Sequence, residues 1–356
     1  MRILDGRLFA FVAFDIGYEI DLGRATALLD AGRGPGLRPH RPAPPSVRYP
    51  EAPVELALGS RRLPDGSDAA VVVRLFDFGV ASFCLTLPSP ATVAELAERG
   101  RFVVEQGGLV EAAERLLGEL MPRLRPAVVR LGVNDIREEY FVFQVRAFEG
   151  APSAEELLAR AGPELAAALA LEPAPLDPTY VRELLATAVS YNPSDLVLCD
   201  WNAAFVYDTK YDDTVAVLEF LNIQLLELRF QDGRLDRALE RFGGLQSRAR
   251  GLGAFLNPYR QPVRELAELT IESALLSERA INAMTLLGDD YLARVARRAA
   301  ERLHLADWVA TVRRKQEAVA TLYGTLNAQL ANLRGEALEL AIVLLIVFEI
   351  ALYFSR

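Results

Sequence analysis

A seven-residue apolar repeat in the C-terminal part of the chain constrains the fold more than any other feature. From Leu305 onward, apolar residues recur at alternating steps of four and three. This spacing is typical of a coiled-coil seam, because it keeps one stripe of the helix facing a partner along its length. We therefore expect the helix to join copies of the chain, with the polar Gln316 fixing register and oligomeric state. The predicted oligomerisation seam consists of Leu305, Val309, Val312, Gln316, Val319, Tyr323, Leu326, Leu330 and Leu333.

Beyond Leu333 the other faces of this helix become apolar as well. At a rise of roughly 1.5 Å per residue, residues 337–354 match the ~30 Å core of a bilayer. The sequence therefore predicts one C-terminal transmembrane helix that acts as a tail anchor. Two acids, Glu339 and Glu349, interrupt the run. An acid in hydrocarbon costs roughly 2.5–3.5 kcal/mol, so Glu349 either reaches the far interface or faces another helix.

The charge balance bears on both location and partners. The formal net charge is −9, which argues against a standing affinity for nucleic acid. Only Lys210 and Lys315 of the 39 basic residues are lysine, a bias that predicts a GC-rich bacterial genome. The N-terminus has no clean signal-peptide core or cleavage site. We therefore expect a single-pass protein of the bacterial inner membrane, with its N-terminal bulk in the cytoplasm.

The order of the predicted elements favours an α+β fold. Strand-like and helical runs alternate through the first 150 residues, which predicts a ferredoxin-like antiparallel sheet covered by helices on one face. Further along, the sequence predicts a helix over residues 179–191 and a strand over residues 195–206. Long helices follow, at about 214–241, 258–287 and 289–354, with a hairpin between the last two. The predicted domains are 1–150, an α+β sheet domain; 151–255, a mixed segment; 256–336, a helical hairpin and coiled coil; and 337–354, a transmembrane helix.

Two cysteines, Cys84 and Cys199, each fall in a predicted strand. We expect two buried, reduced thiols rather than a disulfide.

The most distinctive motif is the block DWNAAFVYD at residues 200–208. It is followed by a predicted helix over residues 219–229 that carries several polar side chains among apolar ones. These stretches resemble the "required for meiotic nuclear division" family, a domain family of unknown function with bacterial and mitochondrial members. Weaker similarity extends over residues 76–80, 287–294 and 300–305, and into the terminal apolar run. The resemblance implies an α+β domain, a helical region and a C-terminal membrane segment. Mitochondrial members are membrane-bound homo-oligomers that support translation, and the family supplies no catalytic residues to carry over.

From this block we predict a candidate functional surface, formed by Asp200, Trp201, Asn202, Asp208, Glu219 and Asn222. The carboxylates of Asp195, Asp200, Asp208, Asp212 and Asp213 could ligate a hard cation, but acids at a strand and turn more often cap helices or face water. Trp201, Phe205 and Tyr207 alternate along the predicted strand and are interpreted as core packing. Glu219 and Asn222 are expected to connect parts of the fold through hydrogen bonds. We predict no catalytic, cofactor or metal-binding residue.

Arginines recur every four residues at Arg294, Arg298 and Arg302, with Arg297 beside them. Such a stripe is usually a solvated face, although it could also contact lipid headgroups or RNA phosphates.

These observations favour a membrane-anchored, self-associating scaffold or adaptor facing the cytoplasm, without catalysis. By analogy with the family, it would support translation or membrane organisation. Its expected partners are copies of itself, the lipid bilayer and an unknown protein, but not nucleic acid. The alternative is an enzyme, or a metal- or nucleotide-binding protein, that uses residues 200–208.

Overall fold

The computed structural model describes residues 1–30, 53–63, 66–105, 107–132, 136–172, 175–243, 261–271 and 290–354. The chain divides into two compact units. Unit 1 comprises Met1–Glu227 and Ala280–Ala306, and unit 2 comprises Leu228–Arg279 and Asp307–Arg356. The side chains of Leu333 and Ala337 and most of the predicted helix 258–287, with its hairpin, lie outside the described residues.

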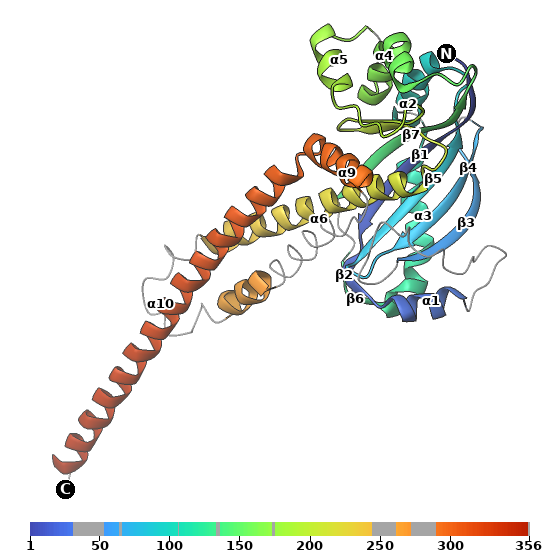
Figure 1. The fold of residues 1–356 in the computed structure, drawn as a ribbon. Coiled ribbons are helices and arrows are strands. Elements are labelled where there is room, and N and C mark those ends of the chain that lie inside the picture. The colour runs from blue at the N-terminus through green and yellow to red at the C-terminus, as the bar shows by residue number, and fades with distance from the viewer. Residues whose placement is uncertain are drawn as a thin grey trace. The chain divides into compact units, whose positions relative to one another are not determined.

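Unit 1 is built on a mixed sheet that has seven strands in the described part of the chain, in the order β3-β4-β5-β1-β7-β9-β8 (Figure 1). Its strands pair antiparallel except for β7 and β9, which are parallel. A separate two-stranded sheet pairs β2 with β6. The strands are β1 (Ile3–Asp15), β2 (Gly17–Ile20), β3 (Val54–Arg62), β4 (Asp68–Leu75), β5 (Val80–Pro88), β6 (Val128–Leu131), β7 (Arg137–Phe148), β8 (Leu196–Cys199) and β9 (Ala203–Tyr207).

Helices cover both faces of this sheet, as the residues of β1 show. Alternate side chains of a strand point to opposite faces. The even-numbered residues of β1 from Leu8 to Phe14 belong to the main core, which also contains buried residues of α1 to α5. Ala13 instead joins a second cluster with Ile223 and Leu226 of α6. The run from Leu8 to Phe14 is therefore apolar throughout rather than alternating. The helices are α1 (Leu22–Asp30), α2 (Leu96–Glu105), α3 (Leu109–Leu124), α4 (Ala154–Ala170), α5 (Pro178–Leu185), α6 (Asp212–Gly243), α9 (Asp290–Arg302) and α10 (Leu305–Phe354).

The ferredoxin-like architecture is wrong, although the fold is α+β. Residues 196–207, which fall in the predicted mixed segment 151–255, contribute β8 and β9 to the same sheet as β1, β3, β4, β5 and β7. After β7, the chain passes through α4 and α5 and returns as β9 parallel to β7, with Phe143 paired to Phe205. A parallel pair of this kind needs a long crossover, which hydrophobic periodicity alone does not reveal. The sheet is therefore larger and mixed.

The predicted transmembrane helix is also wrong. Among the described residues, no helix is both long enough and apolar enough to cross a bilayer. The apolar stretch of α10 contains two acids, Glu339 and Glu349. The tail anchor, the lipid bilayer as a partner and the inner-membrane location depended on this helix, and all three are contradicted.

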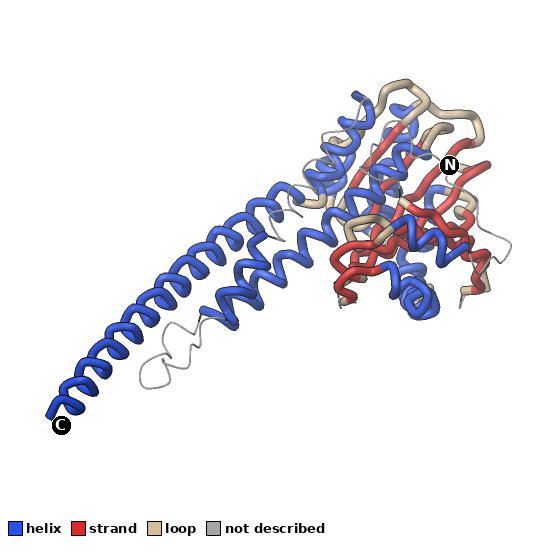
Figure 2. Tube along the Cα trace, turned by 90° about the horizontal axis from the view of Figure 1, so that it is seen from below, coloured by secondary structure: helices blue, strands red, loops and turns tan. Residues whose placement is uncertain are grey.

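In unit 2, the C-terminal part of α6 and α10 run side by side in two views (Figures 1 and 2). Lys315 of α10 lies 2.6 Å from both Asp232 Oδ1 and Asp236 Oδ2 of α6. The predicted seam is partly buried within one chain: Val312, Val319, Leu326 and Leu330 are buried, as is Leu305 of unit 1, whereas Val309, Gln316 and Tyr323 are half-buried. The role of the seam in joining copies remains a prediction.

Candidate ligand-binding face

Helix α9 packs against the edge strand β8 and presents arginines outward. Its buried residues, Leu292, Val295, Ala296 and Ala299, follow the spacing of an amphipathic helix. The sheet edge here is extended by Val189, whose N–H donates to Val197 O at 2.9 Å and whose carbonyl accepts from Val197 N at 2.8 Å. The predicted helix 179–191 accordingly stops at Leu185.

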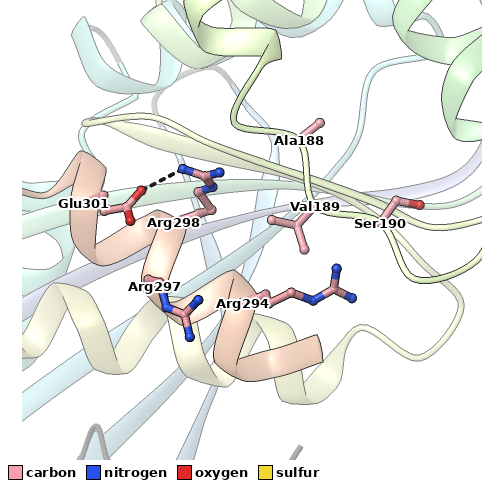
Figure 3. A pocket seen from close by; sticks show the side chains of 7 residues that line it. All are labelled: Ala188, Val189, Ser190, Arg294, Arg297, Arg298 and Glu301. Carbon is pink, nitrogen blue, oxygen red and sulfur yellow. Dashed lines mark hydrogen bonds and ion pairs between the residues drawn. The ribbon is translucent and has the colours of Figure 1, made fainter. Parts of the chain in front are cut away.

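Between this extended edge and α9 lies an open pocket of about 510 Å³, which we call the α9 pocket (Figure 3). Ser190 and Arg294 come from opposite sides of it, and the Arg294 side chain extends toward the Ser190 side. Arg298 is directed at Glu301. The residues lining the pocket are Ala188, Val189, Ser190, Arg294, Arg297, Arg298 and Glu301.

The three arginines differ in how far their charge is balanced. Arg298 Nη1 lies 2.9 Å from Glu301 Oε2, and Arg294 Nε lies 3.6 Å from Asp290 Oδ2. Within the described part of the chain, Arg297 has no carboxylate within ion-pair distance. Arg297 and Arg298 are exposed, and 40% of the Arg294 side chain is exposed, so an anion can reach all three side chains.

One end of α9 is fixed to the β8–β9 turn through Asp200. The buried Asp200 carboxylate forms an ion pair with Arg302 and accepts a hydrogen bond from the Tyr180 hydroxyl. The Tyr140 hydroxyl donates to Asp200 O at 3.0 Å. Burial, followed by the hydrogen bond to Asp200, raises the pKa of Tyr180. Asp200 is therefore a structural anchor for α9, with both carboxylate oxygens occupied.

The next two residues of the block are exposed at this turn. Trp201 is 41% exposed and its ring centroid lies 5.9 Å from that of His304, which follows α9 with a φ of 50°. Asn202 is exposed too. The interpretation of Trp201 as core packing is thus wrong: the predicted strand 195–206 is a hairpin, and Trp201 lies in its turn.

The turn that follows Ser190 carries a second exposed aromatic ring. Asp195, which is buried, accepts hydrogen bonds from Tyr191 N at 2.7 Å and Asn192 N at 2.8 Å. The Ser190 hydroxyl, which has one hydrogen to donate, lies 2.7 Å from both Asn192 O and Asp195 O. Tyr191 is 70% exposed, and its ring centroid lies 6.2 Å from that of Tyr291.

The remaining predicted surface residues lie elsewhere. Asp208 accepts from Lys210 N at 2.8 Å in the turn before α6. Glu219 is buried between α6 and the sheet, where it pairs with Arg74 and accepts from the Ser82 hydroxyl at 2.7 Å. Asn222 donates to Glu138 O at 3.3 Å. The proximity of Glu219 raises the pKa of Arg74. Glu219 and Asn222 thus connect α6 to the sheet and are not exposed to a ligand.

The two cysteines and the acidic residues are the other candidates for reactive or metal-binding groups. Cys84 and Cys199 are buried, unbridged thiols, as predicted, and burial raises the pKa of each to about 12. No cluster of three or more His, Cys, Asp or Glu side chains that could hold a metal ion is found among the residues with described positions.

Sequence reasoning missed Tyr180, Ser190 and Tyr191. The Asn192-Pro193 pair that follows them is a turn signal. Given more weight, it would have ended the predicted helix earlier and placed Tyr191 on a loop. The pairing of Tyr180 and Arg302 with Asp200 has no comparable local signal, because the partners lie 20 and 102 positions away.

Comparison with known proteins supports a family of unknown function. A curated relative, uncharacterized protein MJ0711 of Methanocaldococcus jannaschii, is 28% identical over 179 residues, which cover 50% of this chain and 54% of that protein. No solved structure gives a significant match. Because this relative is archaeal, the expectation of a bacterial protein is contradicted.

The family match covers residues 5–214, which include all of the sheet except the first two residues of β1, together with the block at residues 200–208, and end before α9. More than half of the chain is thereby assigned, and the protein belongs to the family described as the N-terminal domain of uncharacterized protein MJ0711.

Proposed function

We propose that this protein is a self-associating adaptor that binds an anionic group of its partner at the α9 pocket, without catalysing a reaction. One observation carries the proposal: Arg294, Arg297 and Arg298 line an open pocket between α9 and the sheet edge that Val189 extends. Guanidinium groups bind carboxylate and phosphate with paired, charge-assisted hydrogen bonds.

Preorganisation of this region supports a binding role. The Asp200–Arg302 ion pair holds the end of α9, and Asp195 holds the turn at Ser190 and Tyr191. Binding to a prearranged site loses less conformational entropy than binding to a loose one. The same contacts weaken the alternative of an enzyme or metal-binding protein based on residues 200–208, because Asp200 is already engaged.

Self-association is the second part of the proposal, and α10 supports it. Large apolar side chains are exposed along the end of this helix, and contiguous apolar surface of this kind is normally covered by another molecule. We take a second copy as the covering partner because the seven-residue repeat continues through this stretch. The exposed residues are Leu338, Leu340, Ile342, Val343, Leu344, Leu345, Ile346, Val347, Phe348, Ile350, Leu352 and Tyr353.

Kinship with the "required for meiotic nuclear division" family also belongs to this proposal. It is supported by the block at residues 200–208, whereas the family match supports only a domain of unknown function.

Retention on immobilised heparin tests the anion-binding role. We expect the full chain to be retained at low salt despite its net charge of −9, because the arginines form a local site. A variant with Arg294→Ala, Arg297→Ala and Arg298→Ala should elute at clearly lower salt.

The matched control carries Arg62→Ala, Arg264→Ala and Arg313→Ala, which remove three exposed arginines outside the pocket. Both variants change the net charge equally. Equal losses of retention in the two variants, or no retention of the unmodified chain, would refute binding at the α9 pocket.

A further inference from the structure

We propose that the anionic ligand of the α9 pocket is a nucleotide, taken either free or as part of a single strand. This inference rests on the proposed function, since it names the chemical class of ligand for the same site. In the arrangement we infer, the arginines hold phosphate and Tyr191 stacks on the base.

The dimensions and chemistry of the pocket suit the phosphate end of such a ligand. Its volume of about 510 Å³ lies within the ~300–1,000 Å³ typical of small-molecule sites. Arg294 and Arg298 are one helical turn apart and leave α9 on the same side; Arg294 then extends toward Ser190, whereas Arg298 is directed at Glu301 (Figure 3). Arg297, which has no ion-pair partner among the described residues, adds a third cation to the rim.

The aromatic residues select a nucleotide over a simple anion. Tyr191 directly follows Ser190, a lining residue, and Tyr291 precedes Arg294 by one turn on the same side of α9. Neither tyrosine lines the pocket, but their ring centroids lie 6.2 Å apart, so the Tyr191 ring lies near the turn of α9 that precedes Arg294. The backbone N–H of Tyr191 donates a hydrogen bond to the Asp195 carboxylate, while the residue stays 70% exposed. An exposed ring on a rigid backbone beside cations is the arrangement on which nucleobases stack.

A second aromatic ring distinguishes the two sources of nucleotide. Trp201 lies beside His304 at the other end of α9, and a helix of 13 residues is roughly 20 Å long. A mononucleotide bound at Tyr191 cannot also reach Trp201. A strand of several nucleotides can contact both rings.

The test measures the affinity of the full chain for three probes by calorimetry: ATP, inorganic tripolyphosphate and a 5′-phosphorylated hexauridylate. Replacing Arg294 and Arg297 together by alanine should weaken ATP and tripolyphosphate binding tenfold or more. Tyr191→Leu should weaken ATP binding about tenfold and leave tripolyphosphate unchanged, whereas Tyr191→Phe should keep full affinity. Arg62→Ala serves as the control and should change neither.

The results distinguish nucleotide binding from general anion binding at the α9 pocket. If tripolyphosphate and heparin bind through the arginines but Tyr191→Leu does not affect ATP, the site binds anions and the nucleotide inference is overturned. If no polyanion binds, the proposed function fails as well. A loss of hexauridylate affinity in Trp201→Leu, with ATP unaffected, supports a strand as the source. Equal affinities of that variant and the unmodified chain for hexauridylate support the free nucleotide.

Discussion

At the scale of single residues, Asp200 shows how a distinctive motif can have a structural cause. The aspartate opens the most specific block of the sequence, yet its carboxylate is buried against Arg302 and Tyr180. Its chemistry is used to position α9, and the exposed residues of the block are the next two. Position 200 requires a carboxylate, because only a carboxylate can both pair with Arg302 and accept the hydrogen bond from Tyr180. A residue that only positions a helix can therefore be as restricted in identity as one that contacts a ligand.

Replacing Asp200 tests this anchoring. We expect Asp200→Asn to lower the free energy of unfolding by about 1–3 kcal/mol, since the arginine loses its counter-charge in a partly buried position. This loss of unfolding free energy is smaller than for a fully buried ion pair, because the Arg302 side chain is 31% exposed and water screens its charge.

Chemical denaturation provides the measurement. The control is Asp208→Asn, whose carboxylate accepts one backbone bond from Lys210 and should cost under about 1 kcal/mol. If the two variants are equally stable, the ion pair to Arg302 contributes nothing and the anchoring role fails.

At the scale of elements, α6 differs most from an ordinary surface helix. From Val215 to Leu228 its side chains are almost all buried, including those of Glu219 and Asn222. Ile223 and Leu226 join Ala13, Phe76 and Val80 in the cluster on the second face of the sheet. Glu219 and Asn222 thus link α6 to the sheet, as the sequence predicted.

Packing of α6 on this face should be a large contribution to the stability of unit 1. We expect Ile223→Ala to cost about 2–5 kcal/mol, because Ile223 is fully buried and its removal leaves a cavity. Ile271→Ala is the matched control: Ile271 is 63% exposed, and its replacement should stay within about 0.5 kcal/mol. Similar denaturation midpoints for the two variants would show that α6 is not packed as described.

Several features that depend on residues close together in the sequence were predicted correctly, whereas most features that depend on contacts between distant residues were not. The α+β character of the N-terminal half was predictable, because local runs of residue types indicate strands and helices. The start of α4 has an equally local signal, since Ser153 and Glu156 form a capping box three residues apart. The parallel pairing of β7 with β9 was not, since it depends on contacts across a long crossover. The arginine stripe was visible in the sequence, but Ser190 and Tyr191 could join it only through the fold.

At the scale of the whole molecule, two kinds of surface point to two kinds of interaction. The family match ends at residue 214, so the arginines of α9 and the apolar end of α10 lie outside the matched region. The net charge of −9 describes the chain as a whole and does not set the field at the α9 pocket, which three arginines line. Binding at the pocket and association through α10 are therefore separable properties with separate tests.

Light scattering of the full chain tests association directly. We expect a molar mass that is a multiple of the monomer and that rises with concentration, because exposed apolar side chains such as Leu344 and Val347 gain by being covered. Leu344→Glu with Val347→Glu should shift the mass toward the monomer, since burying two carboxylates in an apolar contact is costly. Thr325→Glu with Ala328→Glu adds the same charge at exposed positions of α10 outside the apolar stretch and should leave the mass unchanged. An unmodified chain that stays monomeric at every concentration would eliminate self-association while leaving the α9 pocket to be judged by its own ligands.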